Sequence, residues 1–473
     1  MSSRGHRNVG EGHALRGSFA SPGATCNAIH MGFHETHGAR PLRVLILGGG
    51  GRDHALAWAM AQSSRCGELH AAPGNPGMAG IATCHEHVRP DDIHGMVALA
   101  EQLQVDLVVV GAEDLLVAGV GSMLAERNIP CFGPSAAAAQ LEGSKQFAKS
   151  LMDEAGIPTA RWESCDSPAA AHAAIRRFGG AVAVKTDGLA AGCGAFVCRS
   201  AEHADHVVSD LMVRRIFGAA GDRVIVEELV RGHEVSVMAI TDGTNIVPLP
   251  PARDYKRLLD GDRGPNTGGM GAHAPSHDIS DQASAELAHE VIGPIVAQLA
   301  QRGTPFRGVV YAGLMLDDDG YHVLEYNCRF GNPETQALVR IIDADLLDLM
   351  HRAAAGSLAG VPAIAASGAS VAVCVATPGY PELQLELEPI TVEGIDRAND
   401  VPGVVCFTSL ATPGAVVGSI EALGGRAVTI SAHAHSMDEA IERAYEAASC
   451  ITLEGARMRH DVGACARRLT ATH

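Results

Sequence analysis

Val182-Ala-Val-Lys185-Thr-Asp-Gly188-Leu-Ala-Ala-Gly192-Cys193-Gly194-Ala195 is the stretch that says most about the fold of this chain. An apolar run that carries one lysine leads directly into a loop with three glycines. Glycine has no side chain and readily adopts positive φ, so such a loop can close over a phosphate chain. Cys193 stands where a loop of this kind is expected to carry a cation.

Lysine is scarce in the rest of the chain, which makes the position of each lysine informative. The 473 residues contain four lysines, at positions 145, 149, 185 and 256. The length predicts about three domains, and 47% apolar with 19% charged residues is typical of a soluble globular protein. A net charge of −18 argues against non-specific nucleic-acid binding, although a local site can still bind a small anion.

Targeting signals and disulfides are not indicated. No apolar run approaches the roughly 20 residues that a membrane span needs. Residues 1–42 lack the apolar core of a signal peptide and are predicted to be a disordered extension, or to follow an upstream start codon with Met31 as one alternative. Twelve scattered cysteines without a C-x-x-C pair indicate a reducing cytoplasm. Cys84-His85-Glu86-His87 is interpreted as a turn rather than a metal site, since no second ligand cluster completes it.

The order of apolar runs predicts an α/β domain first. Strands are expected at 43–47, 105–110 and 129–132, with a helix at 52–62 after Gly48–Gly51. The glycine turn is not a dinucleotide fingerprint, because Asp53 occupies the position of its third glycine. Alternating strands and helices imply a parallel sheet, whose ligands bind beyond the carboxyl ends of the strands.

Three further regions follow. A helix is predicted over 144–155, where Ser144 suits the N-cap and Gly156-Ile-Pro158 ends the apolar stripe. The last segment contains strands at 371–376 and 426–430 and a helix at 437–448. The predicted organisation is an extension at 1–42, then domains at 43–143, 144–369 (with a lid subdomain at about 157–230) and 370–473.

Polar side chains gather in Val323-Leu-Glu325-Tyr-Asn327-Cys-Arg329-Phe-Gly-Asn332-Pro-Glu334. In a strand, Glu325 and Asn327 point to the same face. A carboxylate and an amide oxygen side by side suit Mg²⁺, and Arg329 can hold a phosphate or a carboxylate through its fork. An edge strand with a solvated polar face is the alternative, and it fits four polar groups poorly.

Two other segments are candidate binding surfaces. Residues 223–234 resemble a strand that leaves the core into a hinge, where main-chain groups can contact an adenine edge and Glu234 a ribose. A charged cluster at 253–257 precedes the loop Gly264-Pro-Asn266-Thr267-Gly268-Gly269-Met-Gly271, which suits substrate binding. Each segment alone also fits a solvated surface.

Together and in this order, these segments resemble the phosphoribosylamine–glycine ligase family of the ATP-grasp superfamily, from about residue 43 to residue 463. The matching motifs are at 48–54, 72–77, 133–145, 185–194, 264–271, 311–336, 424–426, 442–445 and 459–463. The resemblance implies a mixed α/β and α+β fold: a Rossmann-like N-terminal domain, a central ATP-grasp domain and a small β-rich C-terminal domain. It also implies that ATP phosphorylates a carboxylate and that an amine then attacks the acyl phosphate.

The family's functional residues carry over by motif. ATP phosphates would contact Lys145, Lys185, Gly188, Gly192, Cys193 and Gly194, and adenine and ribose would contact Glu227, Glu228, Val230 and Glu234. Magnesium, or manganese, would bind Glu325 and Asn327, and the reacting groups would contact Arg329, Asp254 and Lys256. The substrates would contact Arg52, Gly74, Asn75, Arg253, Tyr255, Asn266, Thr267, Gly268, Gly269, Asn332 and Glu334. The expected partners are a small carboxylate and a small amine, without nucleic acid or membrane, and a homodimer is expected from the frequency of two-fold assemblies.

The sequence also departs from the family pattern. The family has lysine at Cys193, glutamine at Arg253, histidine at Tyr255 and aspartate at Asn332, and the loop after Pro381 is shorter here. An added cation and a lost anion predict an acid more anionic than glycine, or a different amine. The hypotheses are therefore the purine ligase, a paralogue with other substrates, a regulator that binds ATP without catalysis, and a structural protein, which would leave the glycine loop unexplained.

Overall fold

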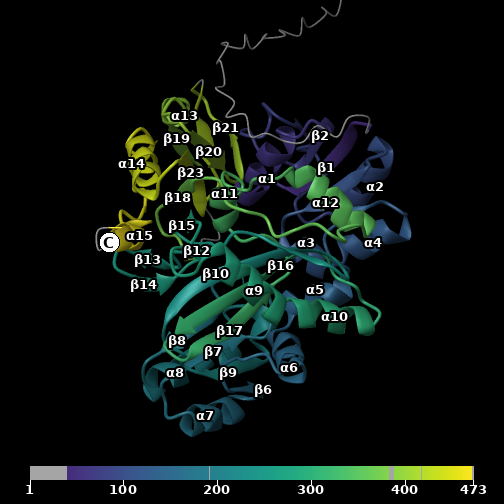
Figure 1. Cartoon of the computed structure of the whole chain (residues 1–473). Coiled ribbons are helices and arrows are strands. Elements are labelled where there is room, and N and C mark those ends of the chain that lie inside the picture. The colour runs from purple at the N-terminus through teal and green to yellow at the C-terminus, as the bar shows by residue number, and fades with distance from the viewer. Residues whose placement is uncertain (1–39, 191, 383–387, 417, 471–473) are drawn as a thin grey trace, which may run out of the picture. The chain divides into compact units, whose positions relative to one another are not determined.

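The computed structural model describes residues 40–190, 192–382, 388–416 and 418–470 (Figure 1). Most of the predicted extension, with the alternative start at Met31, lies outside the described residues. So does the centre of the shortened loop after Pro381, at 383–387. Among the described residues, no helix is long and apolar enough to cross a membrane.

The first sheet is parallel, as predicted, with strand order β3-β2-β1-β4-β5. Its strands are β1 (Leu42–Gly48), β2 (Cys66–Pro73), β3 (Thr83–Cys84), β4 (Leu107–Val110) and β5 (Cys131–Phe132). The helices of this region are α1 (Gly51–Ala61), α2 (Ile93–Leu103), α3 (Glu113–Val117), α4 (Val120–Glu126) and α5 (Ala136–Gly143). Strands β1 and β4 are almost wholly buried, because their apolar side chains pack on both faces of the sheet.

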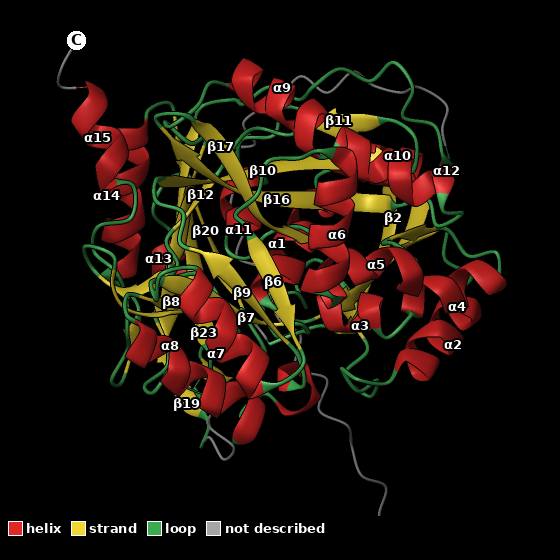
Figure 2. Cartoon of the chain, turned by 90° about the horizontal axis from the view of Figure 1, so that it is seen from below, coloured by secondary structure: helices red, strands yellow, loops and turns green. Residues whose placement is uncertain are grey.

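The glycine loop belongs to a small antiparallel sheet of order β6-β9-β7-β8. Helices α7 and α8 cover one face and bury Val182, Val184, Val224 and Val226 (Figure 2). The elements of this region are α6 (Lys145–Ala155), β6 (Trp162–Cys165), α7 (Pro168–Arg177), β7 (Val182–Thr186), β8 (Ala195–Cys198), α8 (Ala201–Val208), a π turn at Ser209–Val213, a 3₁₀ turn at Gly218–Gly221 and β9 (Val224–Glu228). The apolar run before the glycine loop forms the strand β7, and the predicted helix 144–155 is confirmed.

A second antiparallel sheet, of order β11-β10-β16-β17, carries the predicted acidic strand. Its strands are β10 (His233–Asp242), β11 (Ile246–Pro248), β16 (Arg307–Asp317) and β17 (Gly320–Asn327). Apolar side chains of α9 (Asp281–Val291) and α10 (Gly293–Gln301) pack in the same core as this sheet, and α11 (Glu334–Leu338) and α12 (Leu346–Ala355) follow it.

The C-terminal segment does not form its sheet alone. The order β12-β15-β18-β23-β20 joins two strands from the central region to three from the end of the chain, so the sheet crosses the boundary predicted at residue 370. These strands are β12 (Arg253–Asp254), β15 (Gly271–Ala274), β18 (Ala369–Ala376), β20 (Val404–Thr408) and β23 (Arg426–Ala434). The link fixes the loop between β12 and β15 against the C-terminal segment.

The remaining elements complete this end of the molecule. They are the hairpin β13 (Arg257–Leu259) and β14 (Arg263–Asn266), the sheet β21-β22-β19-β24 with β19 (Ile390–Glu393), β21 (Ala411–Pro413), β22 (Ile420–Ala422) and β24 (Thr452–Leu453), and the helices α13 (Ile395–Asn399), α14 (Met437–Ala448) and α15 (Ala464–Thr470). Helix α14 packs on β18 and β23, and α15 packs on α14 and contacts the Tyr255 hydroxyl through Cys465 (Figure 1).

Candidate active site

All four lysines of the chain line one cavity of about 750 Å³. Lys145 and Lys149 come from α6, Lys185 from β7, and Lys256 from the turn between β12 and β13. In a chain of net charge −18, the cavity wall is balanced, because its four lysines and five arginines match nine carboxylates. The lysines can therefore face an anionic ligand of the size of a nucleotide.

Two of these lysines share one buried carboxylate. The Glu227 carboxylate lies 2.8 Å from Lys185 Nζ and 3.2 Å from Lys149 Nζ, and all three side chains are at most 8% exposed. Burial lowers the pKa of Lys149 to about 8, although the attraction of Glu227 opposes this shift. One anion for two cations leaves a net positive charge at this part of the cavity wall.

Lys149 was not predicted as a site residue. It lies one helical turn after Lys145, so the two ammonium groups share a face of α6. The spacing of four residues between Lys145 and Lys149 is the sequence feature that could have predicted this position. The helix start is fixed by Ser144, whose hydroxyl accepts a bond from the Phe147 amide at 3.1 Å and donates one to Asp187 at 3.0 Å.

The segment between β9 and β10 forms the predicted hinge at the cavity wall. Residues 229–232 line the cavity, where the apolar side chains of Met152, Ala160 and Met315 also lie. Glu228 is held by a two-point ion pair with Arg161, with both distances at 2.9 Å. Apolar side chains beside main-chain groups are the kind of surroundings that suit an adenine ring.

The glycine loop reaches across to the other wall. Gly192 has φ +78°, and a side chain there would approach the Gly268 backbone to 3.2 Å. Gly188, Gly192 and Gly194 line the cavity, whereas Cys193 is half-buried outside the lining. Burial raises the pKa of the Cys193 thiol, and the nearby Arg426 opposes this shift. Arg426 thus supplies a cation close to the position where the family has lysine.

We therefore expect Cys193→Ala to change the KM for ATP by less than about threefold, because the thiol is not part of the cavity wall. Lys185→Ala is the matched comparison, and it should raise that KM by far more. Steady-state kinetics with varied ATP measure both. An effect of Cys193→Ala as large as that of Lys185→Ala would place the thiol at the phosphates.

Glu325 and Asn327 both line the cavity, at the end of β17. A bulge at Leu324 interrupts the pairing of β17 with β16, and Lys185 Nζ donates to the Leu324 carbonyl at 3.0 Å. Burial raises the pKa of Glu325, but Lys256, Lys145, Lys185 and Arg329 outweigh it and lower the pKa to about 2. The carboxylate is therefore ionised throughout the physiological range.

Lys256 bridges the acidic strand and the hinge. Its ammonium group pairs with Glu234 and lies 3.7 Å from Glu325. Burial lowers the pKa of Lys256, yet Glu234, Tyr311, Glu325 and Asp254 raise it well above its ordinary value. Glu234, the predicted ribose ligand, is thus engaged by Lys256.

Asp254 contributes a buried carboxylate to the same region. Burial and the neighbouring Glu334 carboxylate raise the pKa of Asp254 well above its ordinary value. Its Oδ1 has no hydrogen-bond partner among the described residues, whereas Glu334 accepts a bond from Ser236 at 3.1 Å. A buried carboxyl oxygen without a partner is costly, so this atom suits a donor on a bound substrate.

Arg329 lies on the cavity wall with its fork already engaged. Its Nε is 3.2 Å from Glu113 and its Nη2 is 3.0 Å from Glu142. Neither glutamate was among the predicted site residues, although Glu142 lies in the matching motif 133–145, because their pairing joins segments that are roughly 200 residues apart in the chain. Arg329 therefore lies at the site, but its guanidinium group is paired with Glu113 and Glu142. A substrate carboxylate would have to compete with these two glutamates for it.

Arg426, which was not among the predicted site residues, fixes the loop 266–269, which we call the acceptor loop. Arg426 of β23 donates from Nη1 to the carbonyls of Gly269, at 3.1 Å, and Asn332, at 2.7 Å, and also to that of Gly268. Gly268 and Asn332 line the cavity. The Gly424-Gly-Arg426 motif was the available signal, but its role depends on a contact across more than 90 residues.

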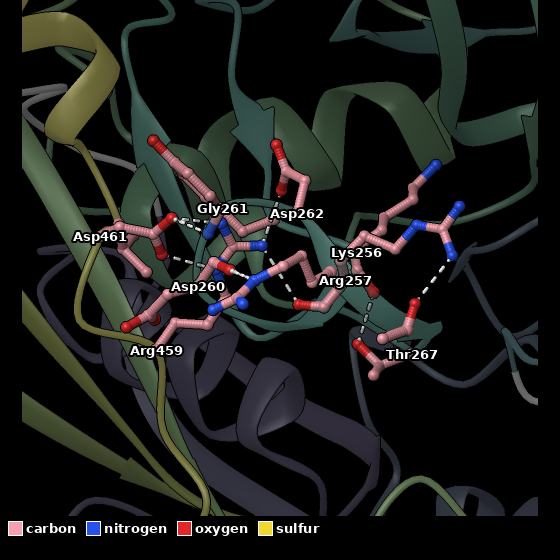
Figure 3. Close-up of polar contacts among 12 residues, drawn as sticks. Lys256, Arg257, Asp260, Gly261, Asp262, Thr267, Arg459 and Asp461 are labelled. Carbon is pink, nitrogen blue, oxygen red and sulfur yellow. Dashed lines mark hydrogen bonds and ion pairs between the residues drawn. The ribbon is translucent and has the colours of Figure 1, made fainter.

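A second arginine holds the hairpin β13–β14 (Figure 3). Arg459 is buried, forms a two-point ion pair with Asp461 with both distances at 2.7 Å, and donates to Asp262 at 2.8 Å. Asp461 also accepts from the Gly261 amide, and Thr267 donates its hydroxyl to the Lys256 carbonyl at 2.9 Å. The C-terminal residues therefore position the loop that carries Lys256.

The structure brings most of the predicted residues into the cavity. Those on its wall are Lys145, Lys185, Gly188, Gly192, Gly194, Glu227, Glu228, Val230, Glu234, Arg253, Asp254, Lys256, Asn266, Thr267, Gly268, Glu325, Asn327, Arg329, Asn332 and Glu334. Outside the wall lie Arg52, Gly74, Asn75, Cys193, Tyr255 and Gly269.

Several of the residues outside the wall have structural partners instead. The Asn75 amide donates to the carbonyls of Gly49 and Thr408 at 2.8 and 3.0 Å. The buried Arg52 donates to Glu113 and to the Phe330 carbonyl, both at 3.2 Å. Tyr255 points into the C-terminal core, where its hydroxyl accepts from the Gly463 amide at 2.7 Å. These three side chains lie outside the cavity wall, and their contacts with the substrates stay predictions.

The turn at Cys84–His87 agrees with its interpretation as a turn with a satisfied histidine. His85 Nε2 lies 3.1 Å from His70 Nδ1. Among the described residues, the set of His, Cys and acidic side chains close enough to share one ion lies elsewhere, at His273, His277 and Cys465.

A nucleotide-sized cavity between two antiparallel sheets, with lysines on one side and an acidic strand on the other, defines an ATP-grasp protein. Family models agree: those for the N domain, the ATP-grasp (A) domain and the C domain of phosphoribosylglycinamide synthetase match residues 42–142, 143–335 and 370–465. The predicted fold of a Rossmann-like domain, an ATP-grasp domain and a β-rich domain is thereby confirmed.

Individual proteins give the same result. The phosphoribosylamine–glycine ligase of Streptomyces coelicolor is 43% identical over 426 residues, which cover 89% of this chain and 99% of that protein. The enzyme of the same name from Caulobacter vibrioides is 41% identical, with 89% and 98% covered. A crystal structure of phosphoribosylamine–glycine ligase from Thermotoga maritima has a TM-score of 0.73 and 31% identity, covering 89% of this chain and all of that one. The chain belongs to the phosphoribosylamine–glycine ligase family and is an ATP-dependent ligase that forms a carbon–nitrogen bond.

Proposed function

We propose that this ligase joins glycine to 5-phosphoribosylamine and converts ATP to ADP and phosphate. The observation that carries the proposal is the convergence of all four lysines on one cavity that also contains an ionised carboxylate. The names of relatives at 41–43% identity that match the chain over nearly their full length support this pair of substrates. In this reaction the glycine carboxylate attacks the γ-phosphorus, ADP leaves, and the amine nitrogen then displaces phosphate from the acyl carbon.

The lysines are arranged to bind the triphosphate. Lys145, Lys149 and Lys185 lie on the side of the cavity next to the glycine loop, and the hinge at 229–232 provides the slot for the base. Three ammonium groups and one buried Glu227 match an anion that carries several charges. Holding the nucleotide in this way supplies positioning and charge stabilisation, which dominate phosphoryl transfer.

Glu325 and Asn327 fit a hard divalent cation. An ionised carboxylate and an amide oxygen lie on one strand at the cavity wall, and both are the oxygen ligands that Mg²⁺ prefers. We propose that they bind Mg²⁺, with Mn²⁺ as a substitute. The ion would neutralise phosphate charge while the lysines hold the phosphates.

The acceptor side of the cavity is proposed to be formed by Asp254, Lys256 and the loop 266–268. The unpartnered Oδ1 of Asp254 can accept a hydrogen bond from the attacking amine and thereby orient its lone pair toward the acyl carbon. Lys256 lies between Glu234 and Glu325, where its charge can stabilise the oxygen of the tetrahedral intermediate.

The geometry weakens the argument for a more anionic acid. Arg253, the added cation, lies 3.1 Å from both oxygens of Asp278, so its charge is already neutralised. Asn332 presents its carbonyl to Arg426 and its side-chain oxygen to Gln336, at 2.9 Å. The pairing with Asp278 thus accounts for the added cation without a change of substrate, whereas these contacts of Asn332 do not replace the lost negative charge.

Arg253→Gln is accordingly expected to change the preference for glycine over aspartate by less than about threefold in kcat/KM. The reason is that the variant removes a cation whose field Asp278 already cancels. The two amino acids are compared as acids in one ADP-release assay with a common amine. A shift of preference toward glycine of more than tenfold would support the paralogue with an anionic acid.

The test of the proposed function is an ADP-release screen of acids and amines with the purified chain. Glycine with freshly made 5-phosphoribosylamine should give the highest kcat/KM, and omission of either should reduce ADP release to background. Faster turnover with another pair would identify a paralogue. Nucleotide binding without turnover on any pair would identify a regulator.

Three coarser proposals accompany this function. We propose a reducing, cytoplasmic location, which is supported by the fact that none of the described cysteines is in a disulfide. The homodimer stays a proposal that sedimentation velocity can test. The domain limits at 43–143, 144–369 and 370–473 are likewise proposed.

A further inference from the structure

Three metal-binding side chains meet behind the acceptor loop, outside the cavity. One ligand atom each from His273, His277 and Cys465 lies within 4.8 Å of the others. His273 is on β15, His277 follows it, and Cys465 is in α15 at the other end of the chain. Nothing in the proposed reaction uses these groups.

We propose that His273, His277 and Cys465 bind one transition-metal ion of the zinc class, which fastens α15 to β15. Two imidazoles and a thiolate are the ligand types that Zn²⁺ selects over Mg²⁺ or Ca²⁺. A water would complete the tetrahedron.

The distances agree with tetrahedral coordination. His273 Nε2 and His277 Nδ1 are 3.2 Å apart. Two nitrogens bound at about 2.0–2.1 Å with a tetrahedral angle would be roughly 3.3 Å apart. The sulfur would be roughly 3.6 Å from each nitrogen, so metal binding draws Cys465 inward by at most about 1 Å.

One of the two outer ring nitrogens has the hydrogen-bond partner that a metal-bound histidine needs. His273 Nδ1 is 3.2 Å from the Tyr255 hydroxyl, whereas His277 Nε2 is 3.6 Å from the Asp278 carboxylate, which is beyond hydrogen-bond distance. A hydrogen-bond partner of this kind orients the ring and fixes which nitrogen faces the metal. Tyr255 is also 3.0 Å from the Cys465 sulfur.

A cation close to the cluster is already paired. The Arg253 guanidinium lies 3.1 Å from the Asp278 carboxylate, which limits its repulsion of a metal ion.

A metal ion at this cluster would also affect the active-site cavity, through Tyr255. Tyr255 lies between Asp254 and Lys256 in the chain, and its hydroxyl contacts Cys465 and the Gly463 amide. The hairpin that follows Lys256 is held by Arg459 and Asp461 (Figure 3). A metal at the cluster would therefore extend this attachment of the C-terminal residues to the acceptor loop, and its role is positioning.

The first experiment is cobalt substitution of the full chain. Metal-free protein is titrated with Co²⁺, and a thiolate-to-cobalt charge-transfer band should grow to one equivalent. Residues 1–39 contain several histidines and Cys26, so the result is the difference between the wild type and Cys465→Ser. Cys465→Ser and His277→Gln should lose the band, whereas Cys450→Ser and His435→Gln, which lie outside the cluster, should keep it. An equal band in Cys465→Ser would overturn the proposal.

The second experiment uses the wild type, so it does not depend on the folding of a variant. Alkylation by iodoacetamide is followed at single cysteines by peptide mass spectrometry. One equivalent of Zn²⁺ should slow modification of Cys465 by at least about tenfold and leave Cys450 unchanged, and a chelator should reverse the effect. Unchanged modification of Cys465 would show a hydrogen-bonded thiol–imidazole pair without a metal.

Discussion

Replacing Glu227 by alanine should destabilise the protein more than any other single change in the cavity. Glu227 is the shared partner of Lys149 and Lys185, and all three side chains are almost fully buried. Removing it leaves the buried ammonium groups of Lys149 and Lys185 without their shared anion. Breaking a buried ion pair in this way costs about 3–5 kcal/mol of unfolding free energy. Urea unfolding measures the loss, and saturating ATP should recover part of it because its phosphates replace the missing charge.

The matched control is the next residue. Glu228→Ala also breaks an ion pair, with Arg161, but both side chains are well exposed, at 44% and 72%. An exposed pair contributes about 0–1 kcal/mol. Glu227→Gln is an intermediate case, since the amide can still accept a hydrogen bond from a lysine. Equal unfolding free energies for the Glu227 and Glu228 alanine variants would mean that the buried cluster does not hold the cavity together.

Glu325→Ala should have the largest effect on catalysis, with a loss in kcat on the order of a thousandfold or more. The variant removes the ionised oxygen ligand proposed for Mg²⁺ and one of the carboxylates that orient Lys256. Lys256 keeps Glu234, so the fold should be preserved and the unfolding free energy little changed. ADP release measures the rate, and the paramagnetic signal of Mn²⁺ measures binding of the ion in the presence of ADP.

Asp317→Asn on the β16–β17 hairpin is the control for Glu325→Ala. It also removes a carboxylate from this sheet, but Asp317 lies outside the cavity, and its partners are the Asp319 amide, at 3.0 Å, and His322, at 3.4 Å. Its kcat should match the wild type. Turnover at the wild-type rate in Glu325→Ala, or undiminished Mn²⁺ binding, would contradict the assignment of the metal ligands.

The parts of the site that the sequence predicted are those whose geometry is local. The i, i+2 spacing of Glu325 and Asn327 put both on one face of a strand, and the glycines at 188, 192 and 194 marked the loop at the cavity. Helix 144–155 was recognisable from its cap and apolar stripe. In each case the decisive interactions lie within a few residues of one another.

The parts that were missed depend on contacts between distant segments. The neutralisation of Arg253 needs Asp278, the fixing of Gly268 needs Arg426, and the engagement of Arg329 needs Glu113 and Glu142. Tyr255 alternates with two cavity residues in sequence and therefore points away from them, into the core. A family motif predicts which positions belong to the site. It does not predict which of those side chains are already paired with other residues of the protein.

The central claim is that this cavity uses ATP to activate the carboxylate of glycine, and an isotope experiment tests it most directly. Glycine labelled with ¹⁸O in both carboxylate oxygens is incubated with ATP, Mg²⁺, 5-phosphoribosylamine and the enzyme, and the released phosphate is analysed by mass spectrometry. Formation of an acyl phosphate transfers one carboxylate oxygen to phosphorus, so each phosphate should carry one ¹⁸O. Product formation with unlabelled phosphate would contradict the account.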